Sequence, residues 1–150
     1  MFRAEQLYLY SLSDFKVVLI SQLAAAMTRK ILIIDDECDI QAVAQLALEV
    51  VAGWTVATAS SGLEGLELAL HEPPDAILLD VMMPDMDGIM TLQALQSNPR
   101  TCMIPVIFMT AKTQLADRER FVKLGISGLI SKPFKAMQLS EQISLALSWA

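Results

Sequence analysis

The sequence predicts an α/β protein built on a doubly wound, five-stranded parallel sheet with helices on both faces. Two observations lead to this prediction. From about Lys30 onward, short apolar runs alternate with stretches in which apolar residues recur at helical spacing. Hydrophobic residues also make up 54 % of the chain, and its mean hydropathy is +0.47. Strands that are buried on both faces, as in a parallel sheet covered by helices, would explain this excess.

Five apolar runs are the expected strands, because each is short and contains β-branched residues. In chain order they are Ile31–Ile34, Thr55–Thr58, Ala76–Leu79, Val106–Met109 and Leu129–Ile130. Since a helical pattern follows each run, the chain is a repeat of βα units. Such units form parallel sheets with right-handed crossovers.

The first two expected helices each have an apolar stripe. The stripe of the first consists of Ile40, Val43, Ala44, Ala47 and Val51. The second begins at Ser61 and Glu64, which have the spacing of a capping box. Its buried residues are expected to be Leu63, Leu66 and Leu70.

The remaining three helices are bounded by glycine and proline. The third begins after Gly88, and Pro99 marks the loop beyond it. The fourth is expected from about Thr113 to Leu124, with Gly125 as a C-cap. The apolar face of the last helix consists of Leu139, Ile143, Ala146 and Leu147.

Residues 1–26 do not fit the βα repeat. We expect them to be an N-terminal extension whose order is open and which could form a helix through Leu12, Phe15, Leu19 and Leu23. Residues 27–150 are expected to form one domain. No apolar run reaches the roughly 18 residues of a membrane span, since Asp14 and Lys16 interrupt the nearest candidate. The sequence therefore predicts a protein without a membrane segment.

The formal net charge of −6 and the pI of about 4.6 argue against a general nucleic-acid binder. The two cysteines, Cys38 and Cys102, do not have the spacing of a disulfide framework or a metal site. Free thiols are typical of a reducing compartment, so the expected location is the cytoplasm.

Polar residues follow four of the expected strands, where a doubly wound sheet binds its ligands. Asp35 and Asp36 follow the first strand, Asp80 the third, Thr110 the fourth, and Lys132 lies just beyond the fifth. If the first and third strands are neighbours, the three carboxylates converge, and a cation is needed to offset their repulsion. A hard divalent ion with oxygen ligands, and Mg²⁺ rather than a dedicated Ca²⁺ cage, fits this set.

These residues lie in stretches that resemble the response-regulator receiver family of two-component systems, in particular its stand-alone, chemotaxis-regulator-like members. The stretches are Ile31-Leu32-Ile33-Ile34-Asp35-Asp36-Glu37, Asp80-Val81-Met82-Met83-Pro84-Asp85-Met86-Asp87-Gly88, Thr110-Ala111-Lys112 and Ser131-Lys132-Pro133-Phe134. The resemblance covers the chain from about Arg29 onward. It implies a flavodoxin-like fold with strand order 2-1-3-4-5.

The resemblance also implies a role for each site residue. Asp80 would accept a phosphoryl group from a histidine kinase or a phosphotransfer protein. Asp36, Asp35, Asp80 and the backbone carbonyl of Met82 would hold Mg²⁺. Lys132 and Thr110 would contact the phosphoryl oxygens. The bond from Lys132 to Pro133 is a candidate cis peptide. The chain would be a switch and not an independent enzyme.

The output surface that the resemblance implies is the fourth helix, fifth strand and fifth helix of the repeat, from about Lys112 to Ala150. A downstream protein, and not nucleic acid, would bind there, and the chain would be a monomer or a weak phosphorylation-dependent dimer. One residue departs from the family: Leu129 occupies the position of an aromatic residue that usually rotates inward on activation.

Three alternative functions remain open. A magnesium-dependent phosphohydrolase would need a second acid–base Asp two residues after Asp80, where this chain has Met82. A flavin-binding protein would need a hydroxyl-rich phosphate loop where this chain has Asp35-Asp36-Glu37. A pseudo-receiver would keep the motifs without using them, and the intact Asp80, Thr110 and Lys132 argue against it.

Overall fold

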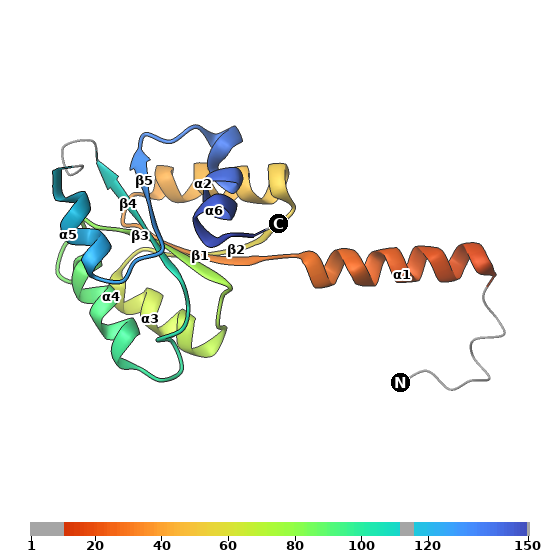
Figure 1. Cartoon of the computed structure of the whole chain (residues 1–150), viewed down its shortest axis with the longest axis horizontal. Helices are drawn as coiled ribbons and strands as arrows, with labels where there is room; N and C mark the ends of the chain where they lie inside the picture. Colours follow the sequence, from red (N-terminus) through yellow and green to blue (C-terminus); the bar gives the residue numbers. More distant parts are fainter. Residues whose placement is uncertain (1–10, 112–115, 150) are drawn as a thin grey trace.

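A five-stranded parallel sheet forms the centre of the molecule in a computed structural model that describes residues 11–111 and 116–149 (Figure 1). The strands lie in the order β2-β1-β3-β4-β5. Their bounds are β1 (Lys30–Ile34), β2 (Thr55–Ala59), β3 (Ala76–Asp80), β4 (Val106–Ala111) and β5 (Gly128–Lys132). All five predicted strands and their order are confirmed, and each strand extends slightly beyond its predicted limits.

The register of the two central strands decides where the functional residues lie. Strand β1 pairs with β3 in parallel, and Ile34 is aligned with Leu79. Each of these residues is followed directly by an aspartate: Asp35 comes immediately after β1, and Asp80 is the last residue of β3. The two carboxylates therefore leave the sheet at the same level, from neighbouring strands.

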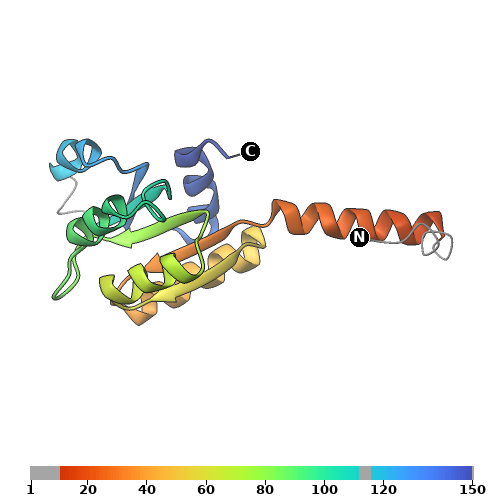
Figure 2. The ribbon, with the colours of Figure 1, turned by 90° about the horizontal axis from the view of Figure 1, so that it is seen from below.

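Helices cover both faces of the sheet, as the βα repeat predicts (Figures 1 and 2). Helices α2 (Cys38–Ala52) and α6 (Leu139–Leu147) lie on one face, together with the short 3₁₀ helix η3 (Ala136–Gln138). The other face carries α3 (Gly62–His71), α4 (Gly88–Ser97) and α5 (Arg118–Lys123). Two separate cores result, one on each side of the sheet.

Strand β1 shows why the composition is so apolar. Its side chains alternate between the two cores, so that Leu32 and Ile34 face the α3–α5 side while Ile31 and Ile33 face the α2–α6 side. All four residues are buried. A strand covered on both faces needs apolar residues at every position.

The predicted stripe of α2 is only partly correct. Ala44 and Ala47 are buried as expected, and so is Leu48, but Val43 and Val51 are exposed. Ala44, Ala47 and Leu48 face the core, and Val43 and Val51 lie to the sides of this contact, where they remain open to solvent.

Helix α3 also differs from its prediction in which of its residues face the sheet. Ser61 is its N-cap, and the Ser61 hydroxyl accepts a hydrogen bond from the backbone N–H of Glu64 at 3.1 Å, as the capping box predicts. However, Leu63 is exposed, while Gly65 and Ala69 face the core. A Cβ atom at Gly65 would lie 2.3 Å from a side-chain carbon of Ile34, so the helix packs on the sheet through small residues.

Helix α5 is shorter than the predicted Thr113–Leu124. It begins at Arg118 and ends at Lys123, and Gly125 follows in the left-handed conformation with φ +88°. Residues 112–115, which the prediction placed partly in this helix, lie outside the described residues. On the last helix, Leu139 and Ile143 are buried and Ala146 and Leu147 pack beside them, as predicted.

Helix α1 (Leu12–Met27) precedes β1 and extends away from the domain (Figures 1 and 2). It lies in the segment predicted as an extension, and the boundary near residue 27 stays a prediction. Within the described residues, no helix is both long enough and apolar enough to cross a membrane.

Candidate functional site

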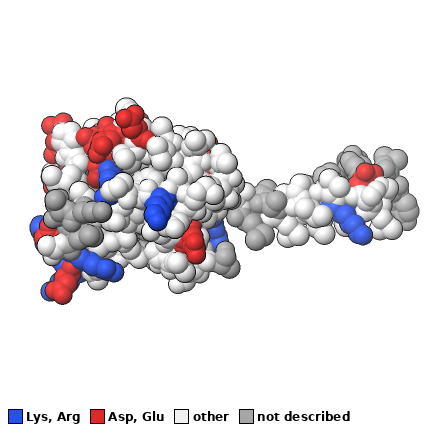
Figure 3. Space-filling model, turned by 90° about the horizontal axis from the view of Figure 1, so that it is seen from above, with Lys and Arg blue, Asp and Glu red and all other residues white. Residues whose placement is uncertain are grey.

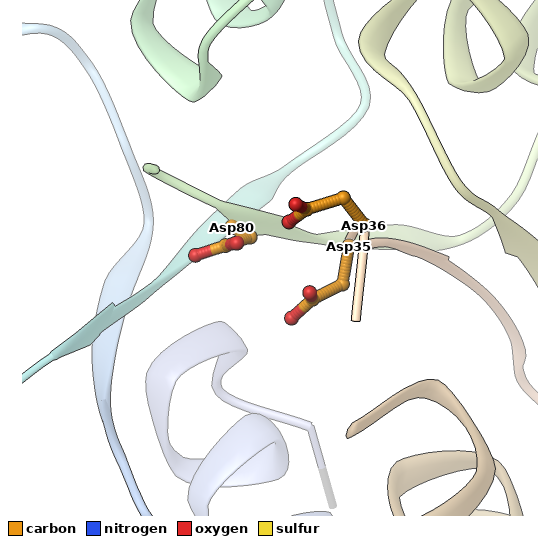
Figure 4. A group of neighbouring side chains, drawn as sticks. All are labelled: Asp35, Asp36 and Asp80. Atoms are coloured by element: carbon orange, nitrogen blue, oxygen red, sulfur yellow. The ribbon is translucent and has the colours of Figure 1, made fainter. Parts of the chain in front are cut away.

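Three carboxylates meet at the carboxyl ends of β1 and β3 (Figure 4). Asp35 and Asp80 are almost fully buried, and Asp36, the next residue along the chain, is the more open of the three. One oxygen from each residue lies within 4.8 Å of the others. The structure therefore brings together the three aspartates that the sequence predicts.

Lys132, at the end of β5, supplies a positive charge to this cluster. Its Nζ atom lies 2.5 Å from Oδ2 of Asp35 and 3.3 Å from Oδ1 of Asp80. A third carboxylate, that of Glu37, lies 3.6 Å away on the solvent side. Only 12 % of the Lys132 side chain is exposed, so these contacts operate with little screening by water.

The surroundings of Asp80 make its ionised form costly. Burial raises the pKa of Asp80 to about 6 from an ordinary value of 3.8, and the negative charge of Asp35 adds to the increase. The charge and hydrogen bond of Lys132 act in the opposite direction but do not cancel the effect. The single lysine thus leaves the acidic cluster under-compensated, which favours the binding of a further cation.

Burial and the neighbouring carboxylates also act in opposite directions on the pKa of Lys132. Burial alone would lower this pKa, but the hydrogen bond to Asp35 and the charges of Asp80, Asp35 and Glu37 outweigh burial and raise it. Lys132 is therefore a permanent cation at physiological pH.

Backbone and side-chain donors hold Asp35 in place. Its Oδ1 atom accepts a hydrogen bond from the backbone N–H of Glu37 at 2.9 Å. The side-chain amide of Gln41 donates to the carbonyl oxygen of Asp35 and, at 3.1 Å, to that of Ala59 on β2. Gln41 thus ties the ends of β1 and β2 together. Sequence reasoning missed it, because only the fold shows that a glutamine in the first turn of α2 reaches back across two strand ends.

Met82 and Gly88 shape the loop that follows Asp80. The backbone N–H of Met82 lies 3.4 Å from Oδ1 of Asp80, while the Met82 side chain is 67 % exposed. A Cβ atom at Gly88 would lie 2.4 Å from the carbonyl oxygen of Asp80. Only glycine permits the start of α4 to approach the end of β3 so closely. The loop itself is bounded by Asp87, whose side chain caps α4 by accepting from the N–H of Met90 at 2.8 Å.

Thr110 lies near the end of β4, one residue beyond Met109, which is aligned with Asp80. It is 1 % exposed, and its Oγ1 atom has no hydrogen-bond partner among the described residues. A buried hydroxyl without a partner costs free energy, roughly 1–3 kcal/mol. The structure thus places a hydroxyl near the site that is available to a new acceptor.

We expect Thr110→Val to stabilise the protein by about 1 kcal/mol, because valine has nearly the same shape and removes the unsatisfied hydroxyl. Chemical denaturation at neutral pH measures this change. Thr101→Val is the matched control: the Thr101 hydroxyl is buried but donates to the carbonyl of Leu95 at 2.7 Å, so its loss should destabilise. Equal losses of stability in both variants would contradict the assignment.

The donor set fits a hard divalent cation such as Mg²⁺. All three side chains are carboxylates, the ligand type that Mg²⁺ prefers. Burial and, after it, the charge of Asp35 raise the pKa of Asp80, so a cation at this cluster would be favourable. The bond between Lys132 and Pro133 is cis, as predicted. In the view of Figure 3, acidic side chains are most concentrated along one edge of the domain, and others lie elsewhere on the same face.

Comparison with known proteins agrees with this geometry. The family model described as "Response regulator receiver domain" matches residues 31–144. The alkaline phosphatase synthesis transcriptional regulatory protein PhoP of Bacillus subtilis is 37 % identical over 121 residues, which are 81 % of this chain and 49 % of PhoP. RpaA of Synechocystis, named a DNA-binding dual master transcriptional regulator, is 36 % identical over 79 % of this chain and 48 % of its own. This chain thus spans about half the length of these relatives.

Two solved structures of similar shape match over nearly their whole length. The chemotaxis protein CheY4 of Vibrio cholerae superposes with a TM-score of 0.73 at 28 % identity, covering 79 % of this chain and 98 % of CheY4. A response regulator receiver domain protein of Clostridium thermocellum gives a TM-score of 0.71 at 32 % identity, covering 80 % of this chain and 94 % of its own.

Proposed function

This chain belongs to the response regulator receiver domain family, and from that membership we propose that Asp80 accepts a phosphoryl group in a Mg²⁺-dependent reaction. Receiver domains are signalling modules and not independent enzymes. The observation that carries the proposal is the position of Asp80: it is buried at the end of β3, beside two further aspartates and 3.3 Å from the ammonium of Lys132.

The donor of the phosphoryl group is the phosphohistidine of a histidine kinase or a phosphotransfer protein. An Oδ atom of Asp80 attacks the phosphorus, a new O–P bond forms and the P–N bond to histidine breaks. The released histidine nitrogen takes the electron pair of that bond. The ionised carboxylate is the nucleophile, and with a pKa of about 6 it prevails at neutral pH.

Neutralisation of charge is the main requirement for this transfer, since the phosphoryl group carries negative charge into an acidic cluster. Asp36, Asp80 and the backbone carbonyl of Met82 would hold Mg²⁺, which would supply positive charge to offset that of the phosphoryl group. Both oxygens of Asp35 already accept hydrogen bonds, from Glu37 and Lys132, which favours a role for Asp35 through water. Lys132 pairs with a phosphoryl oxygen from the other side.

The signal leaves the site through Thr110 and the surface formed by α5, β5 and α6. These are the fourth helix, fifth strand and fifth helix of the repeat, because α1 precedes it. Among the residues that the structure describes, Oγ1 of Thr110 has no partner, which supports this route, since phosphorylation would provide an acceptor for it. Leu129 on β5 packs against the core and replaces the aromatic switch, so a shift of the backbone transmits the change. The receiver of the signal is a protein, in keeping with the net charge of −6.

Incubation with acetyl phosphate tests the proposal, with intact mass as the measurement. We expect the wild type to gain one phosphoryl group in the presence of Mg²⁺ and none in EDTA. Asp80→Asn should lose the gain completely, because an amide is not a nucleophile for this reaction.

Asp85→Asn is the matched control for this experiment. Asp85 is an exposed carboxylate in the same loop with φ +64°, a conformation that asparagine also tolerates. We expect this variant to be phosphorylated like the wild type. If the wild type fails to react with acetyl phosphate and with a histidine kinase, and fails to bind beryllofluoride, the phosphorylation proposal is wrong and a pseudo-receiver scaffold is the better description.

A further inference from the structure

Helix α1 exposes apolar side chains on every side. Seven large ones are between 40 % and 83 % exposed: Leu12, Phe15, Val17, Val18, Leu19, Ile20 and Leu23. At 100° per residue they are distributed around the helix and do not form one narrow stripe. Asp14 and Lys16 are its only charged residues. Among the described residues nothing covers these side chains, and an isolated helix of 16 residues is marginal in water. A partner surface is therefore needed.

The same chain has a second uncovered apolar surface, a groove between α2 and η3. The groove is lined entirely by aliphatic residues: Val43, Leu46, Ala47, Val50, Val51, Ala136 and Met137. Val50 and Met137 are each 74 % exposed and Leu46 is 63 % exposed. Contiguous apolar surface of this kind is characteristic of an interaction site.

We propose that α1 of one copy of this protein lies in the α2–η3 groove of a second copy, and that the exchange is reciprocal. The two contacts are then related by a two-fold axis, which closes the assembly as a dimer. The groove and the helix that fills it belong to the same sequence, so formation of the dimer covers both apolar surfaces at once.

The connection to β1 explains why the groove of a second copy, and not that of the same chain, receives the helix. Only Thr28 and Arg29 join α1 to β1. The carbonyl of Arg29 accepts a hydrogen bond from the N–H of Thr55 at 2.8 Å, and the Arg29 guanidinium lies 4.5 Å from the ring centre of Trp149. A return of α1 onto its own α2 would reverse the chain direction within these two residues and break both contacts.

Charge argues against a membrane surface as the occupant. Helices that lie on anionic bilayers carry Lys and Arg along a polar face. Helix α1 has one lysine and one aspartate, which cancel, and its surface is mostly uncharged (Figure 3). The uncharged groove of aliphatic residues is the better chemical match.

The size of the contact is adequate for a stable dimer. Specific interfaces bury about 1,200–2,000 Å² in total. Because two helices and two grooves take part, each surface needs to contribute only about 300–500 Å² to reach this total. The seven exposed side chains of α1, which include a phenylalanine, are enough to provide this area.

Size-exclusion chromatography of the whole chain with light-scattering detection, over a range of micromolar concentrations, tests the proposal. We expect the wild type to be a dimer. Leu19→Glu in the helix and Leu46→Glu in the groove should each raise the dissociation constant at least tenfold. Both residues are exposed in the single chain, so both variants should remain folded, as circular dichroism would verify. Leu63→Glu, at an equally exposed leucine of α3 on the opposite face, should leave the dimer intact.

A mixture of the two variants separates exchange from other modes of pairing. A Leu19→Glu chain and a Leu46→Glu chain together retain one intact helix and one intact groove, so part of the dimer should return on mixing. A wild type that is monomeric throughout, whether or not it binds lipid vesicles, would overturn the proposal. So would a Leu46→Glu variant that dimerises like the wild type, because α1 would then pair with α1 and not with the groove.

Discussion

Replacement of Lys132 by methionine should destabilise the folded protein by roughly 3–5 kcal/mol at neutral pH, in the absence of Mg²⁺. Methionine preserves most of the apolar stem and removes the ammonium. The buried carboxylates of Asp35 and Asp80 then lie side by side without their counter-charge, and the loss of one partner from a buried ion pair typically costs this much. The free energy of unfolding in urea, with EDTA present, measures the effect.

The pH dependence of this variant distinguishes charge from packing. Without Lys132 the folded-state pKa of Asp80 rises further, because the charge and hydrogen bond of Lys132 that lowered it are gone. The destabilising effect of the ionised Asp80 is complete above its folded-state pKa and disappears as the pH falls toward the unfolded value near 4. The loss should therefore be smaller at pH 5 than at pH 8. A loss of the same size at both values would point to packing.

Lys135→Met is the matched control for the Lys132 substitution. Lys135 is an exposed lysine three residues further along the chain. Exposed charges contribute little to stability, so we expect a change below about 1 kcal/mol. Equal losses of stability in the two variants would show that the ion pairs of Lys132 do not contribute to the free energy of unfolding more than an exposed charge does.

Asp80→Asn should have the opposite effect and stabilise the protein in Mg²⁺-free buffer at neutral pH. Burial and the charge of Asp35 outweigh the attraction to Lys132 and raise the pKa of Asp80 from 3.8 to about 6, which corresponds to a net cost of roughly 3 kcal/mol for the ionised form. Asparagine removes this net cost, but its uncharged amide still has to be buried, which offsets part of the gain. The net gain should be about 1–3 kcal/mol, measured by urea denaturation.

The sign of the pH dependence follows from the direction of the shift. A carboxylate whose folded-state pKa is raised destabilises the protein above that pKa, near pH 6, and has no such effect below the unfolded value near 4. The advantage of Asp80→Asn should therefore be greatest above pH 7 and vanish near pH 4. Millimolar Mg²⁺ should narrow the difference, because it binds and stabilises the wild type. A variant less stable than the wild type at pH 7.5 in EDTA would contradict this account.

The position of the acidic cluster could be predicted from the sequence because it depends only on which residue follows each strand and on which strands are neighbours. Once the chain is a βα repeat, the residue after each strand lies at the carboxyl edge of the sheet. Asp35 and Asp80 follow apolar runs of the same kind, and the pairing of β1 with β3 places them side by side. No side-chain conformation had to be known for this.

The triple contact of Lys132 and the role of Gln41 could not be predicted in the same way. Each depends on how far a long side chain reaches from one element to another: Lys132 reaches from β5 to Asp35 after β1, and Gln41 reaches from α2 to the end of β2. The exposed Leu63 and Val43 are a related case. Apolar periodicity identifies the helix, but the closeness of helix and sheet, set by residues such as Gly65, decides which apolar side chains are covered.

The strand order also places the negative and positive charges of the site on different kinds of strand. Asp35 directly follows β1 and Asp80 is the last residue of β3, and each of these strands is hydrogen-bonded to a neighbour on both sides. Lys132 stands on β5, which has a neighbour on one side only. The negative charges of the site thus lie at the ends of two central strands, and the positive charge lies on an edge strand. We expect a change of ligand at the centre to displace the cation before it displaces the carboxylates.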